Sequence, residues 1–208
     1  EHAVYTELKQ QLVITAEDGK LVANSHYTLE KLFLSDLSLN NYNTDNFYFS
    51  SLHQLTDYSG FIYVPQGRKY KKITSNAFGA GRPHDYVFYD DNRVGQAYYS
   101  GVKKNALTET RYSIENADIH MLSPFLFQDF NLPVVHATFE IIAPNYVNMN
   151  FVLKGEHTDA IKQTKEEKNG RIIYTFTATD MPEVKEMDHV PSWRYYVPHV
   201  IPYITSYR

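Results

Sequence analysis

Residues 11–29 read QLVITAEDGKLVANSHYTL, and this stretch decides the fold class. Apolar side chains recur at every second position of residues 12–16, which is typical of a half-buried β-strand. The dipeptide Asp18-Gly19 follows this run, and it tolerates the positive φ angles of a tight hairpin turn. The stretch therefore predicts a hairpin with one strand on each side of the turn.

The same pattern returns at residues 172–178, after the turn dipeptide Asn169-Gly170. The chain carries 18 Tyr and 12 Phe, and aromatic residues fit the pleated surface of a sheet. Two more turns are expected, at 64–68 and 90–92. Strands are predicted at 11–16, 21–29, 61–64, 69–74, 86–89, 94–99, 107–114, 134–142, 147–153 and 171–179.

Short strands at this spacing predict an all-β protein, a large two-sheet antiparallel β-sandwich with little helix. Residues 159–168 are expected to form the exposed arm of a charged hairpin, with one short helix as the alternative. Residues 119–133 are expected to be a buried crossing loop or an irregular strand. We expect one β-sandwich domain over residues 1–208, with a candidate subdomain break near 100–106.

The ends of the chain predict a fragment of a longer protein. The sequence begins at Glu1 without a Met, so either a signal peptide was removed or the segment starts internally. It ends on an apolar extended run, residues 197–204. We expect a further domain after this run.

Composition excludes several kinds of chemistry. The chain has no Cys, so it holds no thiol nucleophile, Fe–S cluster or zinc-thiolate site. Its formal net charge is −4, whereas proteins that bind phosphate backbones carry a basic surface, so we expect no nucleic-acid partner. No apolar stretch approaches the roughly 18–20 residues of a transmembrane helix, so no transmembrane segment is expected.

No residue pattern predicts a catalytic, cofactor-binding or metal-binding site. The nine histidines show no metal-ligand spacing, and we expect them to be scattered. Residues 79–81, Gly-Ala-Gly, resemble the start of a dinucleotide fingerprint, but Pro83 stands where a helix should begin, so a flexible loop is expected. The histidines are His2, His26, His53, His84, His120, His136, His157, His189 and His199.

Aromatic residues cluster near the C-terminus, at Trp193, Tyr195, Tyr196 and Tyr203. Three interpretations stand side by side: core packing, a contact between domains, or a platform on which sugars stack. These four residues are the candidate interface of the chain.

The order of turns and aromatic residues resembles a bacterial family. The segments that carry the resemblance are 84–87 HDYV, 98–106 YYSGVKKNA, 108–112 TETRY, 125–127 FLF, 132–134 LPV and 141–147 IIAPNYV. The chain resembles, from about Tyr27 onward, the domain of unknown function found N-terminal to transglutaminase-like domains in exported proteins of Bacteroides-type bacteria.

This resemblance implies a noncatalytic β-sandwich located in the periplasm or at the outer membrane or cell surface. In such proteins the Cys, His and Asp of the papain-like active site belong to the following domain. We therefore expect a secreted module, its signal peptide removed, that packs against or supports a transglutaminase-like domain of the same polypeptide and needs no cofactor. The alternative is a free-standing carbohydrate- or peptide-binding module of the bacterial envelope, with a glycan or peptide as its partner.

Overall fold

The computed structural model describes residues 2–36, 41–82, 91–184 and 192–207. Its strands and short 3-10 turns, in chain order, are β1 Ala3–Glu17, β2 Lys20–Phe33, β3 Thr44–Phe49, β4 His53–Gln66, β5 Lys69–Ser75, β6 Phe78–Gly81, β7 Arg93–Tyr98, β8 Leu107–Asn116, β9 Phe125–Leu126, β10 Val134–Pro144, β11 Asn148–Lys154, η2 Thr158–Ala160, β12 Lys162–Lys168, β13 Arg171–Met181, η3 Trp193–Tyr195 and β14 His199–Ser206. No helix among these described residues is both long and apolar enough to cross a bilayer.

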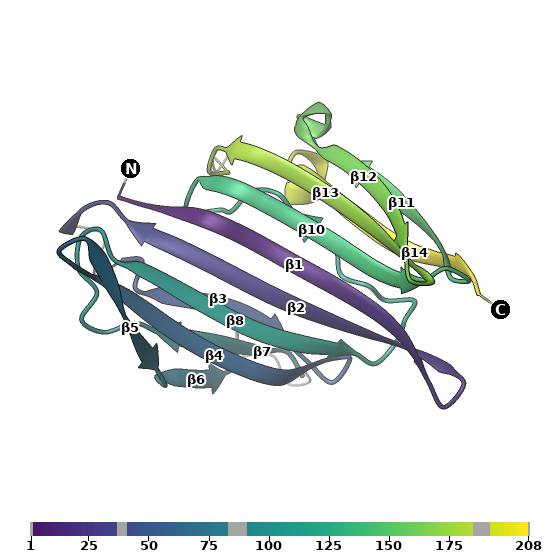
Figure 1. Ribbon diagram of the computed structural model, residues 1–208, viewed down its shortest axis with the longest axis horizontal. Helices are drawn as coiled ribbons and strands as arrows, with labels where there is room; N and C mark the ends of the chain where they lie inside the picture. The colour runs from purple at the N-terminus through teal and green to yellow at the C-terminus, as the bar shows by residue number, and fades with distance from the viewer. Residues whose placement is uncertain (1, 37–40, 83–90, 185–191, 208) are drawn as a thin grey trace.

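One large sheet forms the first layer. Its eight strands follow the order β12-β13-β10-β1-β2-β8-β4-β5, with β1 and β2 in the middle (Figure 1). Every neighbouring pair is antiparallel except β1 and β10, which run parallel. The sheet therefore consists of two antiparallel halves that join along this one parallel pair.

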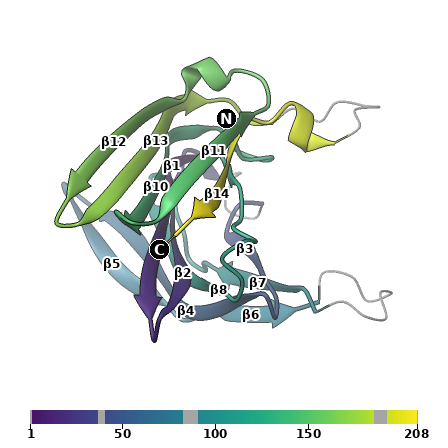
Figure 2. The ribbon, with the colours of Figure 1, turned by 90° about the vertical axis from the view of Figure 1, so that its right-hand side faces the viewer.

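Two small sheets form the second layer. The sheet β11-β14-β9 and the sheet β3-β7-β6 both lie on the same side of the large sheet, which curves around them (Figure 2). The prediction of an all-β sandwich is confirmed. The structure adds that the second layer is divided in two.

Alternation along the central strands builds the core. Leu12 and Ile14 in β1 and Phe139 and Ile141 in β10 are almost fully buried, and they belong to the larger of two apolar clusters. The smaller cluster is formed by Phe33, Ile62, Ala97, Tyr99, Val102 and Ala106. Its members Val102 and Ala106 come from the polar-looking segment 100–106.

The predicted turns at Asp18-Gly19 and Asn169-Gly170 are confirmed. Asp18 and Gly19 have φ angles of 50° and 77°, and Asn169 and Gly170 have 53° and 72°. Both pairs join neighbouring antiparallel strands. Gly67, with a φ of 61°, lies in the predicted turn between β4 and β5.

The prediction of a flexible loop at Gly79-Ala80-Gly81 is wrong. These residues belong to β6, which pairs with β7 through Ala80 and Gly95. A Cβ on Gly79 would make an ordinary contact with the Tyr98 ring at 3.7 Å, and a Cβ on Gly81 would meet nothing within 4 Å, so packing does not require either glycine. Pairing with β7 thus keeps this stretch in a β-strand, although its local sequence indicates a loop.

The two less regular segments that the structure describes match the prediction. Residues 159–168 contain the predicted exposed arm, β12, after the 3-10 turn η2. Residues 119–133 are irregular, as expected, apart from the two-residue strand β9. The predicted strand 86–89 and Asp90 lie outside the described residues.

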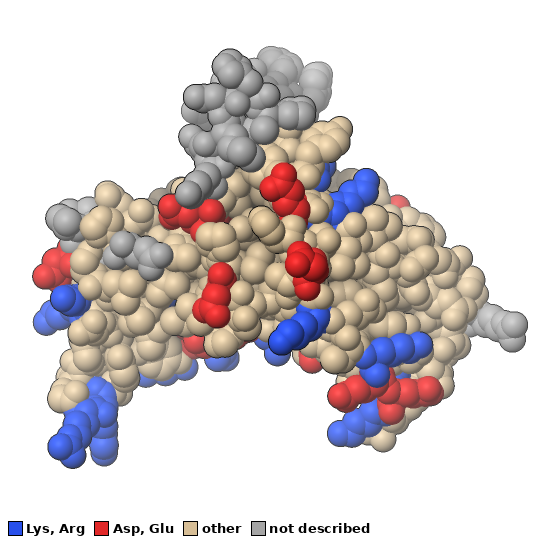
Figure 3. Space-filling model, turned by 90° about the horizontal axis from the view of Figure 1, so that it is seen from above, with Lys and Arg blue, Asp and Glu red and all other residues tan. Residues whose placement is uncertain are grey.

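Charged side chains of both signs lie on the surface that Figure 3 shows. On this face several Asp and Glu side chains lie near the middle, and most Lys and Arg side chains lie toward the margins, over a largely uncharged surface. The two edge strands of the large sheet, β5 and β12, carry six Lys and two Glu between them and are exposed along most of their length. Charge on edge strands discourages pairing with other chains.

Gly95 gives Phe47 its place beneath the β3-β7-β6 sheet. A Cβ on Gly95 would lie 2.6 Å from the Phe47 ring, which is itself buried. Phe47 in turn stacks on Tyr112 of the large sheet, with ring centroids 4.1 Å apart. The missing side chain is therefore what lets the two layers touch here.

We expect Gly95→Ala to lower the free energy of unfolding by about 1–3 kcal/mol, because it overpacks this contact. Urea denaturation followed by circular dichroism measures the change. Gly81→Ala is the matched control, because it lies in the neighbouring strand and its Cβ would meet nothing within 4 Å. Equal loss in both variants would contradict the packing argument.

Candidate functional site

A stack of aromatic rings crosses the space between the layers. Tyr27 in β2 lies flat against Tyr112 in β8, with centroids 4.5 Å apart and an interplanar angle of 7°. Phe47 of β3 continues the stack from the small sheet. Offset ring stacking of this kind adds to the stabilisation that burial provides.

Two cavities share the Tyr27 and Tyr112 rings as lining. One, of about 210 Å³, lies beside β3 and the start of β4. The other, of about 230 Å³, lies between β1 and the segment 124–130. We call these two cavities together the aromatic groove; it lies on the side of the large sheet that carries both small sheets.

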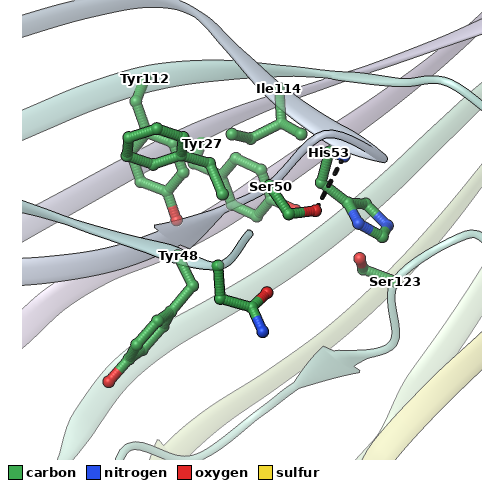
Figure 4. A pocket seen from close by; sticks show the side chains of 9 residues that line it. Tyr27, Tyr48, Ser50, His53, Tyr112, Ile114 and Ser123 are labelled. Atoms are coloured by element: carbon green, nitrogen blue, oxygen red, sulfur yellow. Dashed lines mark hydrogen bonds between the residues drawn. The ribbon is translucent and has the colours of Figure 1, made fainter. Parts of the chain in front are cut away.

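Polar groups line the first cavity at one end. Figure 4 shows the side chains of His53 and Ser123 pointing toward one another, with Ser50 between His53 and the tyrosines. The Ser50 hydroxyl accepts hydrogen bonds from the backbone N–H groups of Leu52 and His53, at 3.2 and 3.3 Å. The His53 ring bonds through Nε2 to the carbonyl oxygen of Met121, at 3.2 Å. Because a carbonyl can only accept, this Nε2 carries the proton.

The groove tyrosines are protonated at neutral pH. Burial raises the pKa of the Tyr27 phenol to about 12. Burial, together with the neighbouring Tyr27 and Asp45, raises the pKa of Tyr112 well above its ordinary value. Both phenols therefore keep their protons at neutral pH, and the groove can bind a ligand through ring faces and hydroxyl groups.

A buried ion pair fixes the β3 side of the site. Lys31 of β2 and Asp45 of β3 are each about 1% exposed, and their charged atoms are 2.5 Å apart. Lys31 also donates to the carbonyl oxygens of Tyr42 and Thr44, at 2.8 and 3.3 Å. The pair thus ties a strand of the small sheet to the centre of the large one.

Hydroxyl groups complete the environment of Asp45. Its carboxylate accepts from the Tyr5 hydroxyl at 3.1 Å and from the Thr110 hydroxyl at 2.5 Å. Thr110 also bonds to the Tyr99 hydroxyl. Tyr5 belongs to the larger apolar cluster and Tyr99 to the smaller one, so this polar network joins the two.

We expect Lys31→Met to lower the free energy of unfolding by about 3–5 kcal/mol, because it leaves the buried Asp45 charge without its partner. The double variant Lys31→Met/Asp45→Leu removes both charges and should recover most of that loss. Urea denaturation of both variants measures the difference. A double variant no more stable than the single one would contradict this account.

Three carboxylates face one another on the opposite side of the large sheet. Glu30 of β2 lies in register with Glu7 of β1 and with Glu109 of β8. Burial raises the pKa of Glu30, and the charges of Glu109 and Glu7 raise it further. Arg111 relieves part of the repulsion through an ion pair with Glu109.

We expect Glu30→Gln to stabilise the fold at neutral pH but not in acid. A carboxyl with a raised folded-state pKa contributes stability that is full below its ordinary value, here 4.5, and is lost as pH rises through the raised value. The urea midpoint of the variant should therefore exceed that of the wild type at pH 7, and the difference should vanish below pH 4.5. Glu115→Gln, an exposed site on β8, is the control, and an unchanged midpoint for Glu30→Gln at pH 7 would contradict the prediction.

The four predicted interface residues lie away from the aromatic groove. Trp193 and Tyr195 belong to the short turn η3, and Tyr203 lies in β14. Tyr195 is 72% exposed, whereas the Trp193 ring contacts His199 edge to face. Their role as an interface stays a prediction. The structure brings none of them to Tyr27 or Tyr112.

Within residues 2–36, 41–82, 91–184 and 192–207, no group of three or more His, Cys, Asp or Glu side chains could hold a metal ion. His84 and His189 fall outside these ranges. Sequence reasoning missed the groove residues, which come from β1, β2, β3, β4, β8 and the segment 124–130. The sequence feature that comes closest to predicting the groove is the mixture of Tyr with Ser and His in those segments.

The sequence profile of DUF3857, a domain of unknown function for which solved structures exist, matches residues 34–185. This match covers well over half of the chain. The chain belongs to the DUF3857 family. The resemblance to such a domain is thus confirmed, while the association with a transglutaminase-like domain stays a proposal. No curated protein resembles the sequence closely enough to count as a relative.

Two solved structures resemble this DUF3857 chain to different degrees. A candidate protease from Parabacteroides distasonis matches 97% of the chain with a TM-score of 0.76 at 17% identity. An M1 zinc metallopeptidase from Deinococcus radiodurans matches 96% at 10% identity, with a TM-score of 0.42. The DUF3857 chain spans 40% of the first protein and 42% of the second.

Proposed function

We propose that this DUF3857 domain is a noncatalytic module of an exported protein, and that it packs against or supports a transglutaminase-like or papain-like domain that follows it in the same polypeptide. The observation that carries the proposal is the likeness to the candidate protease of Parabacteroides distasonis. There the same fold occupies only 40% of the chain, which leaves room for a separate catalytic part.

The chemistry of the aromatic groove supports a binding role. Its tyrosines hold their protons, and the proton of His53 Nε2 is directed at a backbone carbonyl. A thiol nucleophile needs a Cys. The chain has no Cys, so we place thiol chemistry in the neighbouring domain.

Exposed apolar side chains border the groove and suit a protein partner. Tyr48 is 66% exposed, Met121 50% and Phe130 43%. Tyr48 and Phe130 line the two cavities, and the Met121 carbonyl holds His53. Exposed apolar groups gathered at a groove are typical of an interaction site. We propose that the following domain, or a peptide bound to it, covers this rim.

Hydrogen exchange of the full-length protein tests the proposal. We expect the amides of β3 and the 121–130 segment to exchange more slowly when the following domain is present than when it is deleted. Tyr48→Ala with Phe130→Ala should remove most of this protection, and Tyr195→Ala, another exposed tyrosine, should leave it unchanged. A coding sequence without a Cys/His/Asp domain after Arg208 would overturn the adaptor role, as would hydrolysis of peptides by the purified 208-residue chain.

A carbohydrate-binding module is the second candidate. The outer face of the β3-β7-β6 sheet carries the exposed rings of Tyr48 and Tyr98. Between them Gln96 donates to Asn46 at 3.2 Å and accepts from the Tyr98 hydroxyl at 2.6 Å. Aromatic rings beside amides suit the apolar faces and hydroxyl groups of sugars. Retention on cell-wall glycans that is lost in Tyr98→Ala would favour this candidate.

A further inference from the structure

A third cavity, of about 290 Å³, lies on the other small sheet. It is lined by Lys154 of β11, by Ser192, Arg194 and Tyr195 at the turn η3, and by His199 and Ile201 of β14. In Figure 2 the yellow coil of η3 lies beside the start of β14, apart from the β3-β7-β6 sheet. This cavity is separate from the aromatic groove, with which it shares no lining residue.

A close backbone contact holds the walls of this cavity in place. Gly155, which directly follows β11, has a φ of 95°, and a Cβ there would lie 2.1 Å from the Val197 carbonyl oxygen. The next residue, Glu156, donates its N–H to the Tyr196 carbonyl at 2.9 Å. The end of β11 is thus pinned against the segment that leads from η3 into β14. Lys154 and Arg194 are brought to one cavity by this contact.

The two cations of the cavity have no carboxylate partner among the described residues. Lys154 and Arg194 are exposed, and each described ion pair joins other residues. The Arg194 guanidinium lies over the Trp193 ring, 5.0 Å from its centroid, which fixes its position without neutralising its charge. Two unneutralised cations beside one cavity attract an anion.

A buried histidine completes the polar lining. His199 is 1% exposed and lies in register with Lys154 across the β11–β14 pair. Its Nδ1 lies 2.8 Å from the Val197 carbonyl oxygen, and because a carbonyl only accepts, Nδ1 carries the proton. Nε2 has no hydrogen-bond partner among the described residues, and as the unprotonated nitrogen it can accept a hydrogen bond from a ligand hydroxyl, such as the P–OH of a hydrogen phosphate.

We infer that this cavity binds a small oxyanion, a carboxylate or a phosphate group. Arg194 and Lys154 would donate charge-assisted hydrogen bonds to its oxygens, and an Arg fork matches the geometry of both groups. The Ser192 and Tyr195 hydroxyls add further donors, and Ile201 supplies an apolar wall. The inference goes beyond the proposed function, because it concerns a different face and is tested on this chain alone.

Trp193 is the only tryptophan of the chain, so its fluorescence reports on this site alone. We expect sodium acetate or sodium phosphate, titrated into the 208-residue chain at low ionic strength, to change this fluorescence along a saturating curve. The probe that saturates at the lower concentration identifies the preferred oxyanion. Sodium chloride at equal ionic strength is the reference for charge screening.

Variants decide whether the cavity is responsible. Lys154→Ala and Arg194→Gln should each weaken binding by about tenfold, as the loss of one charge-assisted hydrogen bond does. Isothermal titration calorimetry measures both variants, because Arg194→Gln also alters the surroundings of Trp193. Lys103→Ala removes an exposed cation elsewhere and should leave binding unchanged. No saturation with either probe, or equal weakening in Lys103→Ala, would overturn the inference.

Discussion

The buried contact between Lys31 and Asp45 is the constraint on which the arrangement of the two layers depends. Two charges withdrawn from water are tolerable only with close pairing and full hydrogen bonding, which Thr110, Tyr5 and two backbone carbonyls supply. This requirement fixes the position of β3 relative to β2, because Lys31 and Asp45 must stay in contact. The stack of Tyr27, Tyr112 and Phe47 then forms in one way, so the position of the aromatic groove follows from an electrostatic demand.

The division of the second layer leaves part of the centre of the large sheet beside accessible cavities. A single covering sheet would bury the middle of the large sheet, whereas two small sheets leave the Tyr27–Tyr112 pair beside accessible cavities. The groove lies on paired strands, and backbone groups bond to Ser50 and His53 at one end of it. A groove held in this way could orient a segment of a partner, as the proposed supporting role requires.

Local sequence predicted most of the strands and the Asp-Gly and Asn-Gly turns, because alternation and these dipeptides act over a few residues, but it left out β3 and the first halves of β1 and β4. It failed at Gly79-Ala80-Gly81, where pairing with β7 decides the conformation. It also missed the groove and the Lys31–Asp45 pair. These depend on which strands become neighbours, and nothing within a strand encodes its partner. The sequence could not predict the basic cavity beside His199 for the same reason, since Lys154 and Arg194 are far apart in the chain.

The parallel pairing of β1 with β10 has a consequence for how the chain is made. More than one hundred residues separate these strands, so β1 emerges from the ribosome long before its second neighbour exists. At about 5–20 residues per second, its open edge waits on the order of ten seconds. During biosynthesis the nascent hairpin of β1 and β2 is thus the region most prone to aggregate, and the one that a chaperone would most usefully shield.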